Sequence, residues 1–423
     1  MAHPMSLRPP NMGSMKTRIH RGAAEIGGSC VEVEASGQRI LIDAGLPLNH
    51  PADAFPVLPD VASGSLCGIV ISHPHLDHYG LLPWMPSVPV AMGATARRIL
   101  LAAAPFMRQM SLNLSGPDLI DRHPIQMGPF CSTPILVDHS AYDAYALLIE
   151  ADGRRLFYSG DFRTHGRKHG LVDKLIAHPP SNIDTLLLEG TTMSRADKGT
   201  VPTSESALEE EFISRFRATK GLVLVHASAQ NIDRMVSIYR ACQRTGRTLV
   251  IDLYTAMILE ATGNPRIPQS HWERVALCVP KAQRIQIKRN GWFDELDRHS
   301  RHRIFLGRHL AKAPGNYVLL FRGLWMRDLE QAEVLADASL IHSQWEGYLR
   351  EPRFQEIEAW RERHRLQFCQ IHTSGHASPA DLMRFAAALS PKTLVPIHTS
   401  APESFASIYS HVVRHADGEW WEV

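Results

Sequence analysis

Cysteine is scarce in this 423-residue chain, and its placement excludes two kinds of site. There are six cysteines, and no two of them form a Cys-x-x-Cys pair. A thiolate zinc site or a disulfide framework would require paired or densely spaced cysteines. Reduced thiols fit better, and they predict a cytoplasmic protein. The cysteines are Cys30, Cys67, Cys131, Cys242, Cys278 and Cys369.

Long apolar runs are also missing. No stretch of the sequence approaches the roughly 18 residues that a membrane-spanning helix needs. The first fifteen residues contain four Pro or Gly and lack the apolar core of a signal peptide. We therefore expect no membrane partner, and we expect residues 1–15 to form a loose leader.

Excess charge of either sign is small, with 45 Lys and Arg against 43 Asp and Glu. A formal net charge of +2 does not by itself identify a nucleic-acid binder. Residues 281–310 are the exception, because they hold eight Lys or Arg against three acids, a local excess of +5. Such a run is either a nucleic-acid surface or the solvated face of a helix, and both interpretations stay open.

Histidine, by contrast, is abundant, with 23 residues, and the densest group lies in the run Ser-His-Pro-His-Leu-Asp-His at 72–78. This run follows residues 68–71, an apolar stretch typical of a buried strand, so its side chains are expected at the rim of a sheet. A histidine-rich polar loop without function is the alternative. Imidazole and carboxylate groups suit Zn²⁺ and, less exclusively, Mn²⁺ or Fe²⁺. His73 and His75 are therefore candidate ligands of one ion, and Asp77 and His78 of a second.

Three later apolar runs also end in a histidine or an acid. His139 follows residues 134–138, Asp161 closes a hairpin over residues 147–161, and Glu189 ends the run 186–189. Taken alone, a histidine such as His139 is more often structural than a metal ligand, and an aspartate such as Asp161 is more often a turn residue. Together with the first motif they predict one site at the edge of a sheet, where Asp161 is the candidate bridge between two cations.

The second half of the chain suggests an insertion. Helical and strand-like segments alternate from residue 204 to 352, as in a parallel α/β unit. We expect a first domain over residues 16–203, an inserted domain over 204–352, and a return to the first domain over 353–423. The return segment holds two further histidine motifs. The first follows residues 368–371 and contains His372 and His376, and the second follows residues 393–397 and contains His398.

The His-x-His-x-Asp-His motif resembles the metal motif of the metallo-β-lactamase fold. Residues 22–28 and 41–45 look like the opening hairpin of its ribonuclease J branch. Glu189, the insertion and the two histidine motifs of the return segment resemble features of the β-CASP subgroup, the nucleases of this fold. The resemblance implies an α/β protein, a metallo-β-lactamase αββα sandwich with an inserted β-CASP α/β domain. It also implies a metal-dependent ribonuclease, a 5′-to-3′ exonuclease and/or an endonuclease, in which a hydroxide activated by two metals hydrolyses RNA phosphodiesters.

The resemblance assigns the candidate ligands to two divalent ions per chain, with Zn²⁺ expected and Mn²⁺ the alternative. Asp161 is shared by both ions. The first ion is expected on His73, His75, His139 and Asp161, and the second on Asp77, His78, Asp161 and His398.

The resemblance also implies which residues take part in catalysis and in phosphate binding. His376 is the expected general acid, Glu189 the acceptor of its other ring N–H, and Asp77 a ligand with a catalytic role. A pocket for a backbone or 5′ phosphate is expected at Ser228, His372 and Ser374. Alternatively, residues 373–375 form only a tight turn that brings His376 to the metals.

The partner implied is single-stranded RNA, and either a monomer or a homodimer is compatible with the sequence. Long ribonuclease J proteins have a further C-terminal domain, so dimerisation through such a domain is not inferred for this chain. His398 favours the RNA-acting branch over the DNA-processing one. A DNA nuclease, a small-molecule hydrolase of the same fold, and a binding protein with a dead site remain the alternatives.

Overall fold

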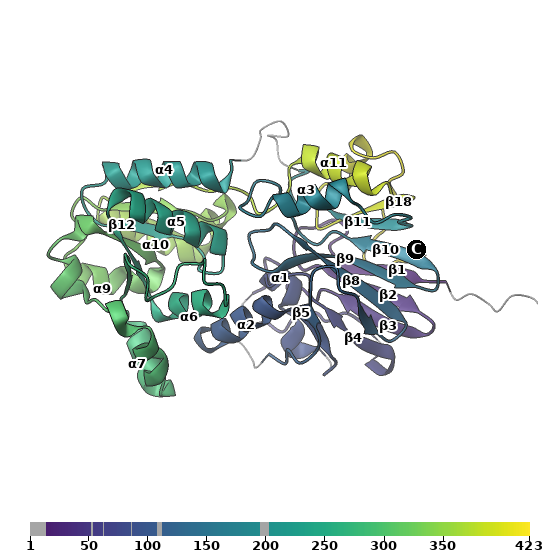
Figure 1. The fold of residues 1–423 in the computed structure, drawn as a ribbon, viewed down its shortest axis with the longest axis horizontal. Helices are drawn as coiled ribbons and strands as arrows, with labels where there is room; N and C mark the ends of the chain where they lie inside the picture. Colours follow the sequence, from purple (N-terminus) through teal and green to yellow (C-terminus); the bar gives the residue numbers. More distant parts are fainter. Residues whose placement is uncertain (1–13, 52–53, 62, 86, 108–111, 195–202) are drawn as a thin grey trace, which may run out of the picture.

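The computed structural model describes residues 14–51, 54–61, 63–85, 87–107, 112–194 and 203–423. Figure 1 shows two α/β bodies side by side, one built from the chain's two ends and the other from its middle. No helix among the described residues is long and apolar enough to cross a membrane. The expected leader falls mostly on residues 1–13, which lie outside the described residues. Met15, at its end, is fully buried and accepts a hydrogen bond from Val423 N.

The first body contains two sheets packed face to face. Their inner faces meet in one core, where alternate residues such as Val31 and Val33 of one sheet face Leu147 and Ile149 of the other. In order across the first sheet, the strands are β19 (Trp420–Glu422), β1 (Lys16–Arg21), β2 (Cys30–Ala35), β3 (Gln38–Ile42), β4 (Leu66–Val70), β5 (Val90–Gly93) and β6 (Asp118–Leu119). Those of the second are β18 (Thr393–Ile397), β11 (Thr185–Glu189), β10 (Arg154–Tyr158), β9 (Ala144–Ala151), β8 (Phe130–Val137) and β7 (Ile125–Met127).

Helices cover the outer face of each sheet. The first sheet packs against α1 (Leu76–Tyr79) and α2 (Ala94–Ala103), and the second against α3 (Gly170–Ala177) and α11 (Pro379–Leu389). Helix α11 begins where Ser378 accepts a hydrogen bond from Asp381 N, and it buries Leu382, Phe385 and Leu389 on one face. The layers are therefore α, β, β, α, and the predicted sandwich is confirmed. Helix α2 ends at Ala103, and a 3-10 turn (Ala104–Phe106) follows it.

The second body is a parallel sheet with helices on both faces. Its strands, in order, are β14 (Val275–Leu277), β13 (Thr248–Ile251), β15 (Tyr317–Phe321), β12 (Val223–His226), β16 (Ser339–His342) and β17 (Gln367–Gln370). One core joins the sheet to α4 (Glu205–Ala218), α5 (Ile232–Thr245), α6 (Leu253–Ala261), α7 (Lys281–Asn290) and α8 (Phe293–Arg298). The other face packs on α9 (Met326–Gln331) and α10 (Pro352–Arg363).

Local sequence signals explain where the main helices of this inserted domain begin and end. Ser204 caps α4 by accepting a hydrogen bond from Ala207 N, and Asn231 caps α5 in the same way through Arg234 N. Helix α5 ends at Gly246, whose left-handed backbone (φ 75°) suits a glycine.

The boundary expected at residue 353 is wrong. Phe354, Ile357 and Trp360 of α10 are buried in the core of the inserted domain, and β17 pairs in parallel with β16. The inserted domain therefore runs to about Gln370. The sequence showed a charged helix, but not the sheet against which its few apolar side chains pack.

Candidate metal centre

The predicted ligands converge where strands of the two sheets in the first body end. His73 and His75 follow β4, Asp77 and His78 lie on α1, and His139 follows β8. Asp161 comes after β10, and His398 directly after β18. All seven side chains belong to groups whose ligand atoms lie within 4.8 Å of one another.

Three histidines form the first group. Nδ1 of His75 lies 3.2 Å from Nε2 of His73 and 3.1 Å from Nε2 of His139. The expected fourth member is close by, because Oδ2 of Asp161 is 3.8 Å from Nε2 of His73. Three imidazole nitrogens turned toward one point, with a carboxylate beside them, are a suitable donor set for a divalent transition metal.

Asp77, His78 and His398 form the second group. Oδ2 of Asp77 lies 3.9 Å from Nε2 of His78 and 3.8 Å from Nε2 of His398. Oδ2 of Asp161 is 3.2 Å from Nε2 of His78 and 3.7 Å from Nε2 of His398. Asp161 thus stands between the two groups, in the position expected of a bridging carboxylate.

Two buried polar atoms at this place have no hydrogen-bond partner among the described residues, Nε2 of His78 and Oδ1 of Asp161. An orphaned polar atom is costly inside a protein. A cation coordinated by both atoms removes that cost. The residues present therefore fit a divalent metal ion.

Asp43 orients the second group and was missed as a site residue from sequence. Its carboxylate accepts hydrogen bonds from Nδ1 of His78 at 2.7 Å, from the hydroxyl of Tyr158 at 2.7 Å, and from both N and Oγ of Ser72. Because Nδ1 of His78 carries the proton, Nε2 is left to face the site. An acid directly after an apolar strand was the available signal, but residues 41–45 were interpreted only as part of the opening hairpin.

The rings of His139 and His398 are also oriented by hydrogen bonds at Nδ1. Nδ1 of His139 donates to the backbone oxygen of Gly375 at 2.6 Å, and Nδ1 of His398 lies 2.7 Å from Oγ of Ser29. Each contact uses Nδ1 and turns Nε2 toward the cluster. The ring orientations are therefore set before any ion binds.

The electrostatics of the centre favour neutral imidazoles in most positions. Burial lowers the pKa of His75 to about 4 and lowers that of His398, and it holds the pKa values of His73 and His139 well below the usual range. Neutral imidazole is the form that binds metal.

His78 and Asp161 behave differently from the neutral histidines. Burial lowers the pKa of His78, but the charges of Asp161, Asp43 and Asp77 outweigh it and raise that pKa well above its usual value. Burial raises the pKa of Asp161, but the neighbouring rings of His398, His78 and His376 and a hydrogen bond with His78 outweigh it and hold that pKa well below its usual range. Without a metal, a proton on His78 neutralises this excess negative charge, and a metal ion would replace that proton.

His376 and Glu189 lie beside the cluster. Nδ1 of His376 is 3.2 Å from Oε2 of Glu189 and 3.7 Å from Oδ2 of Asp161. Glu189 also accepts hydrogen bonds from the backbone N–H groups of Phe162 and Thr191. The carboxylate is thereby fixed as the acceptor of the Nδ1 proton of His376.

The three residues expected to bind phosphate lie on one edge but are not all adjacent. Ser228 and His372 each stand two residues beyond the end of a strand, β12 and β17, and β16 separates these strands. At a strand spacing of about 4.8 Å, their backbones lie roughly 10 Å apart. Oγ of Ser374 accepts a hydrogen bond from His376 N, which is the tight-turn arrangement.

A buried ionic cluster, which sequence reasoning did not find, joins the two bodies behind the centre. Arg163, two residues after Asp161, pairs with Asp138 at 3.2 Å, with Glu205 at 3.3 Å and with Asp233 at 2.6 Å. Arg234 of α5 pairs with Glu205 at 3.1 Å. Asp138 precedes His139, so this cluster holds two ligand-bearing loops against α4 and α5.

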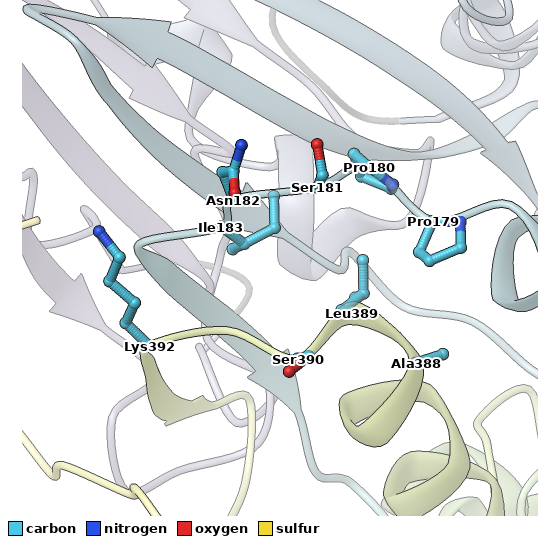
Figure 2. Close-up of a pocket in the computed structure, with 9 residues that line it drawn as sticks. All are labelled: Pro179, Pro180, Ser181, Asn182, Ile183, Ala388, Leu389, Ser390 and Lys392. Carbon is cyan, nitrogen blue, oxygen red and sulfur yellow. The ribbon is translucent and has the colours of Figure 1, made fainter.

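Two other features lie away from the centre. The hollow in Figure 2 is lined by residues 179–183 and by the end of α11, at the amino ends of β11 and β18 and thus at the opposite end of the sheet from His398. The basic segment 281–310 includes α7, which projects from the inserted domain in Figure 1. Its cations have no ion-pair partner among the described residues except Arg298, which pairs with Glu260.

Comparison with known proteins agrees with this geometry. Residues 38–251 match a family described as a beta-lactamase superfamily domain, and residues 363–406 match one described as a Zn-dependent metallo-hydrolase RNA specificity domain. The chain belongs to the metallo-β-lactamase superfamily. Within this superfamily it is a β-CASP protein similar to ribonuclease J.

Among curated relatives, the chain is 26% identical over 430 residues to "Ribonuclease J" of Helicobacter pylori (strain ATCC 700392 / 26695), an alignment that spans 95% of this chain and 57% of that one. It is 24% identical to "Cleavage and polyadenylation specificity factor 73" of Drosophila melanogaster, over 40% of this chain and 27% of that one. This metallo-β-lactamase protein thus spans little more than half of the first relative's length.

A solved structure shares the fold. The crystal structure of a protein of unknown function from Enterococcus faecalis V583 superposes with a TM-score of 0.76 at 21% identity, over 97% of this chain and 100% of that one. At this identity the likeness supports the two-domain architecture and nothing about activity.

Proposed function

We propose that this protein is a metal-dependent ribonuclease that hydrolyses phosphodiester bonds of single-stranded RNA in the cytoplasm. The observation that carries the proposal is the convergence of seven candidate ligands with the His376–Glu189 pair in one buried cluster. The similarity to proteins named ribonuclease J supports RNA as the substrate. Six free cysteines fit a reducing compartment.

Two zinc ions are the proposed cofactor. In support, His73, His75 and His139 form one group of candidate ligands, and Asp77, His78 and His398 form another. One matching family is described as Zn-dependent. When bound, divalent ions would supply Lewis acidity, which lowers the pKa of water toward about 7 and offsets negative charge on a phosphate.

The protein's own groups supply positioning and the proton. Glu189 keeps the proton of His376 on Nδ1 and favours the positively charged ring, so Nε2 can donate a proton to the leaving oxygen. The Nδ1 contacts of His78, His139 and His398 keep the ligand nitrogens in place through the reaction. Asp77 serves as a ligand at the more open side of the cluster, where its side chain is 16% exposed.

We further propose that the edge formed by Ser228, His372 and Ser374 receives a backbone or 5′ phosphate. Supporting this, the three residues follow strands that end at the same edge of the inserted sheet, next to the turn that carries His376. A phosphate held there lies at a fixed distance from the metal centre, so a 5′-monophosphorylated strand is shortened from its 5′ end. A strand that reaches the metal centre without its 5′ end bound at this edge is instead cut internally.

The decisive experiment uses end-labelled RNA and DNA oligonucleotides of the same sequence, each with a 5′ hydroxyl, monophosphate or triphosphate. Products are resolved by length after incubation with zinc-loaded protein. Faster cleavage of RNA, with mononucleotides released from the monophosphorylated 5′ end, supports the proposal. Cleavage of DNA alone would assign the protein to a DNA nuclease, and no cleavage of either would overturn the nuclease proposal.

A further inference from the structure

The segment that follows β16 lies next to the turn that carries His376. Strand β16 pairs in parallel with β17, and His342 lies opposite Gln370 in the register. Residues beyond His342 therefore run beside residues beyond Gln370, which lead to His376. Oγ of Ser343 donates to the backbone oxygen of Ile371 at 2.6 Å, and the Arg234 guanidinium donates to the backbone oxygen of Ser343 at 3.0 Å. The two segments are thus fixed to one another.

Two aromatic side chains stand on this segment and are open to solvent. Trp345 is 44% exposed and Tyr348 is 38% exposed. Their rings meet edge to face, with centroids 5.5 Å apart and planes at 82°. Tyr348 lies in the short 3-10 helix η8 (Glu346–Arg350), and its backbone N–H donates to the backbone oxygen of Trp345. The pair is therefore a rigid corner made of two exposed rings.

Gly347 allows the indole to lie flat on the backbone. A Cβ atom at this position would stand 2.3 Å from two atoms of the six-membered ring of Trp345. Any larger residue would push the ring away. Because one side of the indole is supported by Gly347, the exposed part of the ring is presented as a fixed platform.

The corner stands at the edge of the inserted sheet from which the chain runs to the metal centre. Trp345 and Tyr348 follow the end of β16, β17 ends beside it, and the chain beyond β17 leads to His376. A strand that reaches the metal centre along this edge passes the two rings.

We propose that Trp345 and Tyr348 form a nucleobase-stacking subsite that holds the RNA strand next to the scissile phosphate. The inference rests on the proposed function. Every nucleobase has a flat face that stacks on an aromatic ring, so such a subsite grips single-stranded RNA without selecting its sequence. A duplex keeps its bases stacked on one another and gains nothing from the corner, so the subsite also favours single strands.

The test combines variants with substrates that lack one base. Binding of a fluorescent single-stranded RNA is measured by anisotropy with a chelator present, and cleavage is measured separately with zinc. Trp345→Ala is expected to weaken binding and raise KM about 5- to 100-fold, the range for loss of one stacked base. Trp345→Phe keeps a ring and retains most of the affinity. Val413→Ala is the control, because Val413 is 42% exposed and its backbone N–H donates to the backbone oxygen of Leu394 near the amino end of β18, at the opposite end of that strand from His398.

An abasic site moved along the RNA identifies the stacked position without any variant. Wild-type protein loses affinity when the abasic site occupies one or two adjacent positions, and Trp345→Ala no longer responds to the abasic site there. If wild-type protein binds and cleaves RNA but is insensitive to every abasic position, the subsite does not exist. Equal abasic profiles of wild type and Trp345→Ala would also overturn it. Failure of wild-type protein to act on any RNA would instead remove the proposed function on which the inference rests.

Discussion

Asp43 Oδ2 and His78 Nδ1 are joined by a 2.7 Å hydrogen bond between two fully buried side chains. The bond fixes the tautomer of His78, and the same carboxylate ties Tyr158 and Ser72 to it. One acid without metal contact thus orders one edge of the candidate metal centre.

Replacing Asp43 should weaken metal binding without removing a ligand. In Asp43→Asn the amide can turn its nitrogen toward His78, so the ring loses its acceptor and its preferred tautomer. We expect metal affinity to fall about 10- to 100-fold, measured by competition with a chelator of known affinity. Asp60→Asn, at an exposed acid, is the control and should bind as wild type.

The division of ligands into two groups predicts metal stoichiometry. Wild-type protein should contain about two ions per chain by elemental analysis. His75→Ala and His398→Ala each remove a ligand from one group only, so each should retain about one ion. Asp161→Ala should lower occupancy at both positions and abolish cleavage, because Asp161 stands between the groups. Full occupancy in Asp161→Ala would contradict a bridging role.

Loss of His376 should affect turnover more than substrate binding. A general acid acts only in the transition state, so His376→Ala is expected to lower kcat by about 10²- to 10⁴-fold with little change in KM. Glu189→Gln should give a smaller loss and shift the pH profile to lower pH, because a neutral amide stabilises the charged imidazole less. Single-turnover rates between pH 5 and 9 test both, and parental rates for His376→Ala would remove it as the acid.

The phosphate edge predicts a selective defect. Ser374→Ala and Ser228→Ala should reduce cleavage from a 5′-monophosphorylated end while internal cutting of a circular RNA persists, because a circle presents no end. Gel analysis of both substrates separates the two activities. A parallel loss on the circle in Ser374→Ala would show that its hydroxyl serves only the turn, through the bond with His376 N.

The buried ionic cluster predicts an acid-dependent loss of stability. Although burial raises the pKa of Glu205, the charges of Arg234 and Arg163 outweigh it and lower the pKa from 4.5 to about 2. The folded-state pKa lies below the unfolded one, so the carboxylate stabilises the fold above pH ~4.5 and this contribution, about 3 kcal/mol, is lost as pH falls toward 2. Denaturant unfolding at pH 7, 4 and 3 should show a flatter pH dependence in Glu205→Gln. Glu211→Gln, at an exposed acid on the same helix, should keep the parental slope.

The candidate ligands could be named from sequence because most of them follow an apolar strand and because their motif resembles a known one. The structure brings them together, since the ends of neighbouring strands meet at one edge. Asp43 and Arg163 could not be named from sequence, because their roles depend on partners far along the chain, such as Tyr158 and Glu205. The extent of the inserted domain was missed for a similar reason. Phe354, Ile357 and Trp360 are visibly spaced along one helical face, but nothing local indicates which sheet they cover.

Strand β18 pairs with β11, although about two hundred residues separate them in the chain. The first two hundred residues therefore cannot complete the candidate centre by themselves. His398 joins the other six candidate ligands only when β18 adds to the edge of the second sheet beside β11. Completion of the centre thus depends on a strand pairing of very long range, which forms slowly compared with local contacts.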